Sequence, residues 1–178
     1  MPDAQAFLTL AKDLALEAAG AVRTFSDEDR ADSRFSDSHH KELKSRVDTI
    51  LDEIILCGLK DTGLPILTEE SGLVGDPSDQ GLMFIVDPLD GTYNFVSDLG
   101  PSAISIALWE QGRPVFGVIY DLMREELSWG GRDMGSFRDG SRMSVSEKVE
   151  RIRSAICTGF PVRADLEDDV LRQEFWAL

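Results

Sequence analysis

The sequence predicts a layered α+β domain in which two N-terminal helices pack on a mostly antiparallel sheet. Two amphipathic segments come first in the chain, and short apolar runs separated by turn residues follow them. The length of 178 residues is that of one domain or of part of one. With 42% apolar and 29% charged residues, the composition is typical of a chain that folds around a core.

The two helices are predicted from apolar residues spaced three and four positions apart. The first helix begins after Asp3, a residue type that caps helices, and its apolar face continues to Phe25. The second runs from about Ile50 to Leu59 and stops before Gly63-Leu64-Pro65. Residues 26–44 between them are polar and charged without a clear period, which predicts a loop or a hairpin.

Short apolar runs predict the strands. Residues 65–68 and 82–86 both end at acidic residues, as buried strands do when their ends face a cleft. Further along the chain, alternating apolar and polar residues with glycine-containing turns predict an antiparallel meander. Its runs cover residues 104–109, 115–120, 127–129 and 135–138, with a turn at Gly112-Arg113-Pro114; a last run at 154–157 precedes a helix through Leu166, Val170, Leu171 and Phe175.

Charge and composition limit the partners that we expect. There are 18 basic and 33 acidic residues, a net charge of −15, which repels polyanions and disfavours nucleic acid as a partner. The longest apolar run, residues 82–86, is too short to span a membrane. If the substrate is a phosphate ester, a bound metal must neutralise it, because so few basic side chains are present.

The ends and the cysteines of the chain indicate a cytoplasmic protein. The N-terminus has no basic region and no cleavage site of a secretory signal. Cys57 and Cys157 lack CxxC spacing and lie far apart in the sequence, so we expect two reduced, half-buried thiols.

Acidic residues gather where the predicted elements meet. Glu69 follows one buried strand, Asp87 and Asp90 follow another, and Asp48 lies at the start of the second helix. Carboxylates at the ends of two neighbouring strands converge, and oxygen ligands without His or Cys suit Mg²⁺ rather than Zn²⁺. The sequence therefore predicts a magnesium site.

The string Asp-Pro-Leu-Asp-Gly-Thr at residues 87–92 has a definite local geometry. Pro88 fixes φ and turns the chain directly after the strand, so both aspartates and the carbonyl of Leu89 can point into one space. Gly91 permits close backbone approach, and Thr92 begins a short helix whose free N–H groups face an anion. This pattern predicts a phosphate held between divalent metal ions and a helix N-terminus.

Residues 84–95, Phe-Ile-Val-Asp-Pro-Leu-Asp-Gly-Thr-Tyr-Asn-Phe, resemble the signature of the inositol monophosphatase family, magnesium-dependent and lithium-sensitive phosphatases of small phosphate esters. Residues 67–71 resemble the family's upstream Glu-Glu motif, and 42–48 resemble the segment that ends in its catalytic-support aspartate. Residues 115–120 and 158–161 resemble further family segments in the expected order. The resemblance implies the layered αβαβα sugar-phosphatase fold.

The resemblance also implies roles for individual residues. Glu69, Asp87 and the Leu89 carbonyl would hold a first Mg²⁺ ion, and Asp87 with Asp90 would hold a second. The implied reaction is in-line attack of a metal-activated water on phosphorus, without a covalent intermediate.

The implied catalytic residues are Asp48, Thr92 and Glu69. Thr92, hydrogen-bonded to Asp48, would orient and help deprotonate the attacking water. The implied substrate-binding residues are Asp90, Gly91 and Thr92, the last two through backbone amides that take phosphate oxygens.

One departure from the family pattern concerns the second metal ion. The family completes this site with an aspartate from a C-terminal Trp-Asp motif, whereas Trp109, Trp129 and Trp176 are followed by Glu, Gly and Ala. We therefore expect residues 1–178 to be the N-terminal portion of an inositol monophosphatase-like domain, with its C-terminal portion absent. We also expect this chain alone to bind one divalent metal at best and to have negligible phosphatase activity, and the resemblance implies a homodimer at full length.

Three function hypotheses follow. The first is a phosphomonoesterase acting on inositol monophosphate or a similar small polyol phosphate. The second is a 3′-phosphoadenosine nucleotidase or a histidinol phosphatase of the same superfamily; Asn94 favours the inositol type, because the nucleotidases tend to carry Lys-Glu there. The third is an inactive remnant that binds only metal or a partner.

Overall fold

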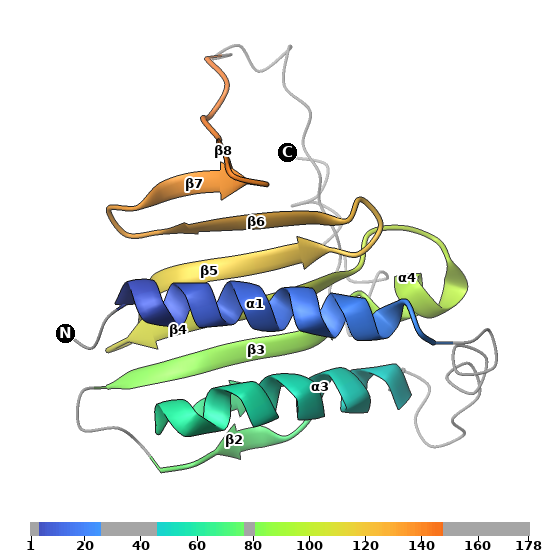
Figure 1. The fold of residues 1–178 in the computed structure, drawn as a ribbon, viewed down its shortest axis with the longest axis horizontal. Helices are drawn as coiled ribbons and strands as arrows, with labels where there is room; N and C mark the ends of the chain where they lie inside the picture. The colour runs from blue at the N-terminus through green and yellow to red at the C-terminus, as the bar shows by residue number, and fades with distance from the viewer. Residues whose placement is uncertain (1–3, 26–45, 77–80, 148–178) are drawn as a thin grey trace, which may run out of the picture.

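An eight-stranded sheet carries two long helices on one of its faces (Figure 1). The computed structural model describes residues 4–25, 46–76 and 81–147. Helix α1 spans Ala4–Val22 and helix α3 spans Arg46–Leu59. No helix among the described residues is long and apolar enough to cross a membrane. The predicted α+β class, with two N-terminal helices on a mostly antiparallel sheet, is confirmed.

The strands lie in the order β2-β1-β3-β4-β5-β6-β7-β8. Within this sheet, β1 and β3 are parallel neighbours, and every other neighbouring pair is antiparallel. The strands are β1 Ile66–Thr68, β2 Gly72–Val74, β3 Leu82–Asp90, β4 Ala103–Glu110, β5 Arg113–Asp121, β6 Glu126–Gly131, β7 Gly135–Arg138 and β8 Ser141–Arg142. A 3₁₀ helix, η2, covers Lys60–Thr62, and a short helix, α4, covers Thr92–Ser97.

The core lies between the two helices and the sheet. Helix α1 contacts β4 and β5, whereas α3 contacts β1 and β3. Alternate residues of the central strands point at the helices, as the two-residue period of a strand requires. The largest fully buried side chains are Leu8, Val47, Leu51, Ile55, Leu59, Phe84, Leu89, Val96, Ile104, Ile106, Leu108 and Phe116. Their burial fixes α3 against the two strands that lead into the predicted acidic site.

Some elements differ from the sequence prediction. The turn predicted at residues 112–114 lies at Gln111-Gly112, both with positive φ, and Arg113 already belongs to β5. Two successive residues with positive φ give the turn whose twist suits an antiparallel hairpin, so the second strand starts sooner. Cys57 is a free cysteine as predicted, but it is exposed rather than half-buried. Asp3, the loop at 26–44, the run at 154–157 with Cys157, and the final helix lie outside the described residues.

The close approach of α1 and α3 generates a prediction about two glycines. A Cβ on Gly58 of α3 would overlap the buried Leu14 side chain of α1, whereas a Cβ on Gly20 of α1 meets no atom within 4 Å. We expect Gly58→Ala to lower the free energy of unfolding by about 1–3 kcal/mol through overpacking. Gly20→Ala, the control, should raise it by about 0.5–1 kcal/mol, because alanine favours the helix. Urea unfolding of both variants tests this, and equal shifts would contradict the packing.

Candidate active site

The parallel pairing of β1 and β3 brings Glu69 and Asp87 together. Thr68 of β1 pairs with Val86 of β3, so the next residue on each strand is an acid at the same edge. The Glu69 amide donates a hydrogen bond to the Val86 carbonyl at 3.2 Å, which continues the ladder beyond β1. The predicted convergence of carboxylates from two neighbouring strands is therefore present for this pair.

Asp87 lies in an acidic environment. Burial, followed by the negative charges of Glu69 and Asp90, raises the pKa of its carboxyl group from 3.8 to about 7. A hydrogen bond from the Leu89 amide to Asp87 Oδ1, at 3.2 Å, opposes the shift. The three carboxylates therefore repel one another, and a bound cation would relieve this repulsion.

Strand β3 reaches the site through a β-bulge. Asp87 pairs with Ser105 of β4 and Asp90 pairs with Ala103, so two residues of β3 lie opposite one residue of β4. Pro88 is one of these two, and its missing N–H suits a position where the ladder is interrupted. The strand is thus not ended by Pro88, as the sequence suggested, but continues through the bulge to Asp90.

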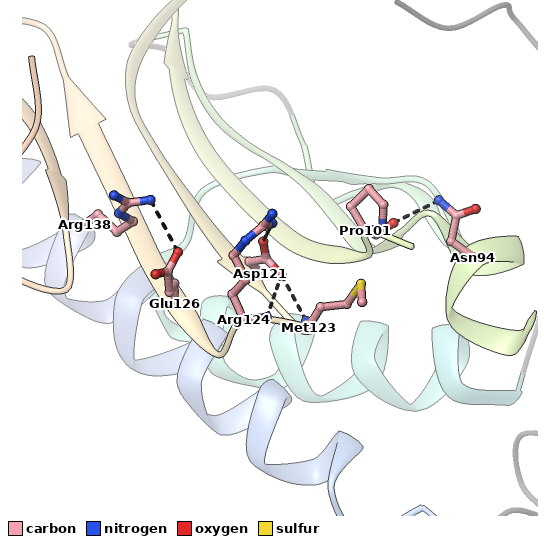
Figure 2. Close-up of polar contacts among 7 residues, drawn as sticks. All are labelled: Asn94, Pro101, Asp121, Met123, Arg124, Glu126 and Arg138. Atoms are coloured by element: carbon pink, nitrogen blue, oxygen red, sulfur yellow. Dashed lines mark hydrogen bonds and ion pairs between the residues drawn. The ribbon is translucent and has the colours of Figure 1, made fainter. Parts of the chain in front are cut away.

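Gly91 connects β3 to α4 where the backbone is crowded. Its φ of 79° is in the left-handed region, and a Cβ there would lie 2.8 Å from the Pro101 carbonyl oxygen. Figure 2 shows Asn94 of α4 reaching the same carbonyl, to which its side-chain amide donates a hydrogen bond at 2.9 Å. The close backbone approach predicted at Gly91 is present, and it is made by the segment that precedes β4.

Thr92, the first residue of α4, contacts α3 directly. Its hydroxyl oxygen lies 2.8 Å from Asp48 Oδ1 and 3.0 Å from the Leu89 carbonyl oxygen. Because a hydroxyl has one proton, it donates to one of these acceptors at a time, and its lone pairs remain able to accept a hydrogen bond from water. Asp48 is buried in the first turn of α3, where the helix dipole stabilises its negative charge. The pairing of Asp48 and Thr92 implied by the family resemblance is therefore present.

A second aspartate of α3, which sequence reasoning missed, contacts the turn after β1. The Ser71 hydroxyl donates a hydrogen bond to Asp52 Oδ2, and the Ser71 amide donates to Thr68 Oγ1 at 2.8 Å. Asp52 lies four positions after Asp48 and is buried. Two acids one helical turn apart on an otherwise apolar face were the signal in the sequence that could have identified it.

The oxygen donors of the site fit a hard divalent cation. Glu69, Asp87, Asp90 and the Leu89 carbonyl offer oxygen ligands, which Mg²⁺ prefers. The raised pKa of Asp87 reflects negative charge that such a cation would neutralise. In the described part of the chain, no group of three or more His, Cys, Asp or Glu side chains is gathered closely enough to hold a metal ion by itself.

The fold is that of known proteins. It matches SuhB from Bartonella henselae with a TM-score of 0.72 and 32% identity, over 80% of this chain and 55% of that one. It also matches inositol monophosphatase from Anabaena with a TM-score of 0.68 and 28% identity, over 83% of this chain and 52% of that one. These proteins share the layered sheet and helices described above, so the class is that of the inositol monophosphatase-like fold.

The sequence comparisons give the family. Residues 3–172 match the model of the inositol monophosphatase family, and the chain belongs to that family. Nus factor SuhB of Escherichia coli K12 is 40% identical over 99 residues, which cover 56% of this chain and 37% of that protein. Fructose-1,6-bisphosphatase of Pyrococcus furiosus is 33% identical over 99 residues, 56% of this chain and 38% of that protein. The chain thus matches well under half the length of these curated relatives.

The electrostatics of Asp87 predict a pH dependence of stability in metal-free buffer. The pKa of Asp87 is about 7 in the folded protein and 3.8 for an unperturbed aspartate, so the folded state binds the proton more tightly. The stability that this proton contributes is fully present below about pH 4. It is lost as the pH rises through about 7, so the melting temperature should fall from about pH 5 to about pH 8. Asp87→Asn cannot titrate and should show a flatter profile.

Thermal unfolding followed by circular dichroism, with a chelator present, measures this. Asp13→Asn, a change of an exposed aspartate on α1, is the control and should keep the wild-type slope. Identical slopes for wild type and Asp87→Asn would show that Asp87 does not hold the proton.

Proposed function

We propose that the protein is a Mg²⁺-dependent phosphomonoesterase that hydrolyses inositol monophosphate or a similar small polyol phosphate. The observation that carries this proposal is the half-buried Asp87 carboxylate facing Glu69 and Asp90, next to the Thr92–Asp48 hydrogen bond. Membership of the inositol monophosphatase family supports phosphatase chemistry. The proposed substrate is a small phosphorylated molecule.

The proposed metal ligands are Glu69, Asp87, the Leu89 carbonyl and Asp90. Mg²⁺ bound there would supply positive charge to the phosphate and lower the pKa of water. The carboxylates would hold the ion in place, and its positive charge would reduce the repulsion among them. The very features that make the site unfavourable without a cation, burial and three like charges, support this assignment.

The proposed catalytic pair is Thr92 and Asp48. Asp48 accepts the hydrogen bond of the Thr92 hydroxyl, which leaves the hydroxyl oxygen to accept a hydrogen bond from the attacking water and to orient it. The N–H groups of Gly91 and Thr92 lie at the start of α4, where a helix has no internal acceptors for them. We propose that they bind phosphate oxygens.

The names of the relatives point to several substrates. The relatives include a fructose-1,6-bisphosphatase and a protein named as a Nus factor, and these names favour no single substrate for this chain. A structure of a Staphylococcus aureus relative, 26% identical with a TM-score of 0.62, holds 2′-AMP. Inositol monophosphate, a 3′-phosphoadenosine nucleotide, histidinol phosphate and fructose 1,6-bisphosphate should therefore be compared as substrates.

Asp87→Asn tests the metal assignment. Because Asp87 is a proposed Mg²⁺ ligand, losing its charge without changing its shape should abolish Mg²⁺ binding to this chain and phosphate release by the full-length protein. Titration calorimetry with Mg²⁺ and a phosphate-release assay measure the two effects. Retention of more than about a tenth of kcat, roughly 1.4 kcal/mol of barrier, contradicts the assignment.

Thr92→Ala tests the proposed positioning of water. We expect Mg²⁺ affinity to stay nearly unchanged while kcat of the full-length protein falls about a hundredfold, since the hydroxyl acts on the water alone. Thr92→Ser keeps a hydroxyl at this position and should recover most of the rate. Calorimetry and single-turnover kinetics separate the two effects, and a matching loss of metal binding would show that Thr92 has a different role.

A further inference from the structure

Asp52 has an unusual environment for an acidic side chain. Only 3% of its surface is exposed, and among the described residues its Oδ1 atom has no hydrogen-bond partner. Its other oxygen, Oδ2, accepts the hydrogen bond from the Ser71 hydroxyl. Buried polar atoms are normally paired, and leaving one unpaired destabilises the fold. The contacts of Asp52 should therefore explain why a buried carboxylate is present at this position.

Asp52 holds the turn that contains Glu69. At the near end of this turn, the Glu69 amide is bonded to the Val86 carbonyl of β3. At the far end, Ser71 is bonded through its amide to Thr68 and through its hydroxyl to Asp52. Glu69 itself is exposed and lies between these two attachments. Removing the Asp52 contact would release the far end of the turn from α3.

The same helix also holds the other half of the site. Asp48, one turn before Asp52, is bonded to Thr92 at the start of α4. Between the two aspartates, Leu51 is fully buried in the core, so the helix cannot rotate without exposing it. The Glu69 turn and Thr92 are therefore both attached to one fixed helix, at two residues separated by about 6 Å of rise.

We infer that Asp52 is a positioning residue of the metal site, which acts through Ser71 to hold Glu69 opposite Asp87. This inference rests on the proposed function, because it assigns Asp52 to the orientation of a proposed metal ligand. Residues that orient metal ligands typically change metal affinity by 10- to 100-fold when they are replaced. The unpaired Oδ1 atom is the part of the carboxylate that this role does not use.

Asp52→Leu replaces the carboxylate acceptor with an apolar side chain of similar size. The dissociation constant for Mg²⁺ should rise about tenfold. The melting temperature should not fall, because an incompletely paired buried carboxylate is replaced by an apolar group and the exposed Ser71 hydroxyl can turn to water. If Asp52 only stabilised the fold, the melting temperature would fall and the dissociation constant for Mg²⁺ would stay unchanged. Asp52→Asn keeps an acceptor for Ser71 and should recover most of the affinity.

Ser71→Ala breaks the contact from the other side. Mg²⁺ affinity should fall as in Asp52→Leu, but the melting temperature should also fall, because the Asp52 charge is left buried and unpaired. The double variant should bind Mg²⁺ no more weakly than Asp52→Leu alone, since both changes remove one contact. Glu53→Gln removes an exposed charge from the same helical turn and is the control; its affinity should match that of wild type.

Titration calorimetry with MgCl₂ and amide hydrogen exchange of residues 68–71 are measured on the same variants. An unchanged dissociation constant in Asp52→Leu, or an equal loss in Glu53→Gln, overturns the inference. If wild type binds no Mg²⁺, the proposed function fails, and hydrogen exchange, which needs no metal, still decides the role of Asp52. Faster exchange at Ser71 in Asp52→Leu but not in Glu53→Gln supports it, and unchanged exchange overturns it.

Discussion

The parallel pairing of β1 with β3 is the constraint on which the candidate site depends. In an otherwise antiparallel sheet, this pair brings the C-terminal ends of two strands to the same edge, where the next residues are Glu69 and Asp87. An antiparallel pair would have placed these two acids at opposite edges. Burial and mutual repulsion then raise the pKa of Asp87, so this topology concentrates negative charge at one point.

Helix α3 determines how the rest of the site is arranged around that point. Its apolar residues pack on β1 and β3, while Asp48 and Asp52 contact Thr92 and Ser71. One rigid element therefore holds both segments that flank the carboxylates. This arrangement explains why a helix that supplies no proposed metal ligand still carries two buried acids.

Much of the fold could be predicted from sequence, because amphipathic spacing and strand alternation are local signals. Helix α3 and the strands of the meander follow from Leu51, Ile55 and the alternation around Ile104 and Ile106. The bulge at Pro88 and the contact between Asp52 and Ser71 could not be predicted. Both depend on how segments far apart in the chain meet, and a single sequence carries no signal of register or of side-chain partners.

Three features of this chain that carry a local energetic cost lie near the carboxylates. Asp87 has a raised pKa, Gly91 adopts a positive φ in a crowded place, and Asp52 buries an unpaired oxygen. Away from the site, alternation and burial hold in the strands and helices, and residues with positive φ such as Gln111 and Asp139 lie in the turns between strands. Proteins tolerate such local costs where function requires a fixed geometry, provided that the surrounding core is well packed. Here the core between α3 and the sheet provides that packing, and the costs fall on the residues that contact the carboxylates or the turns holding them. Asp52 and Asp87 are both kept buried or half-buried next to the ends of β1 and β3, and this supports the proposal that the site lies there.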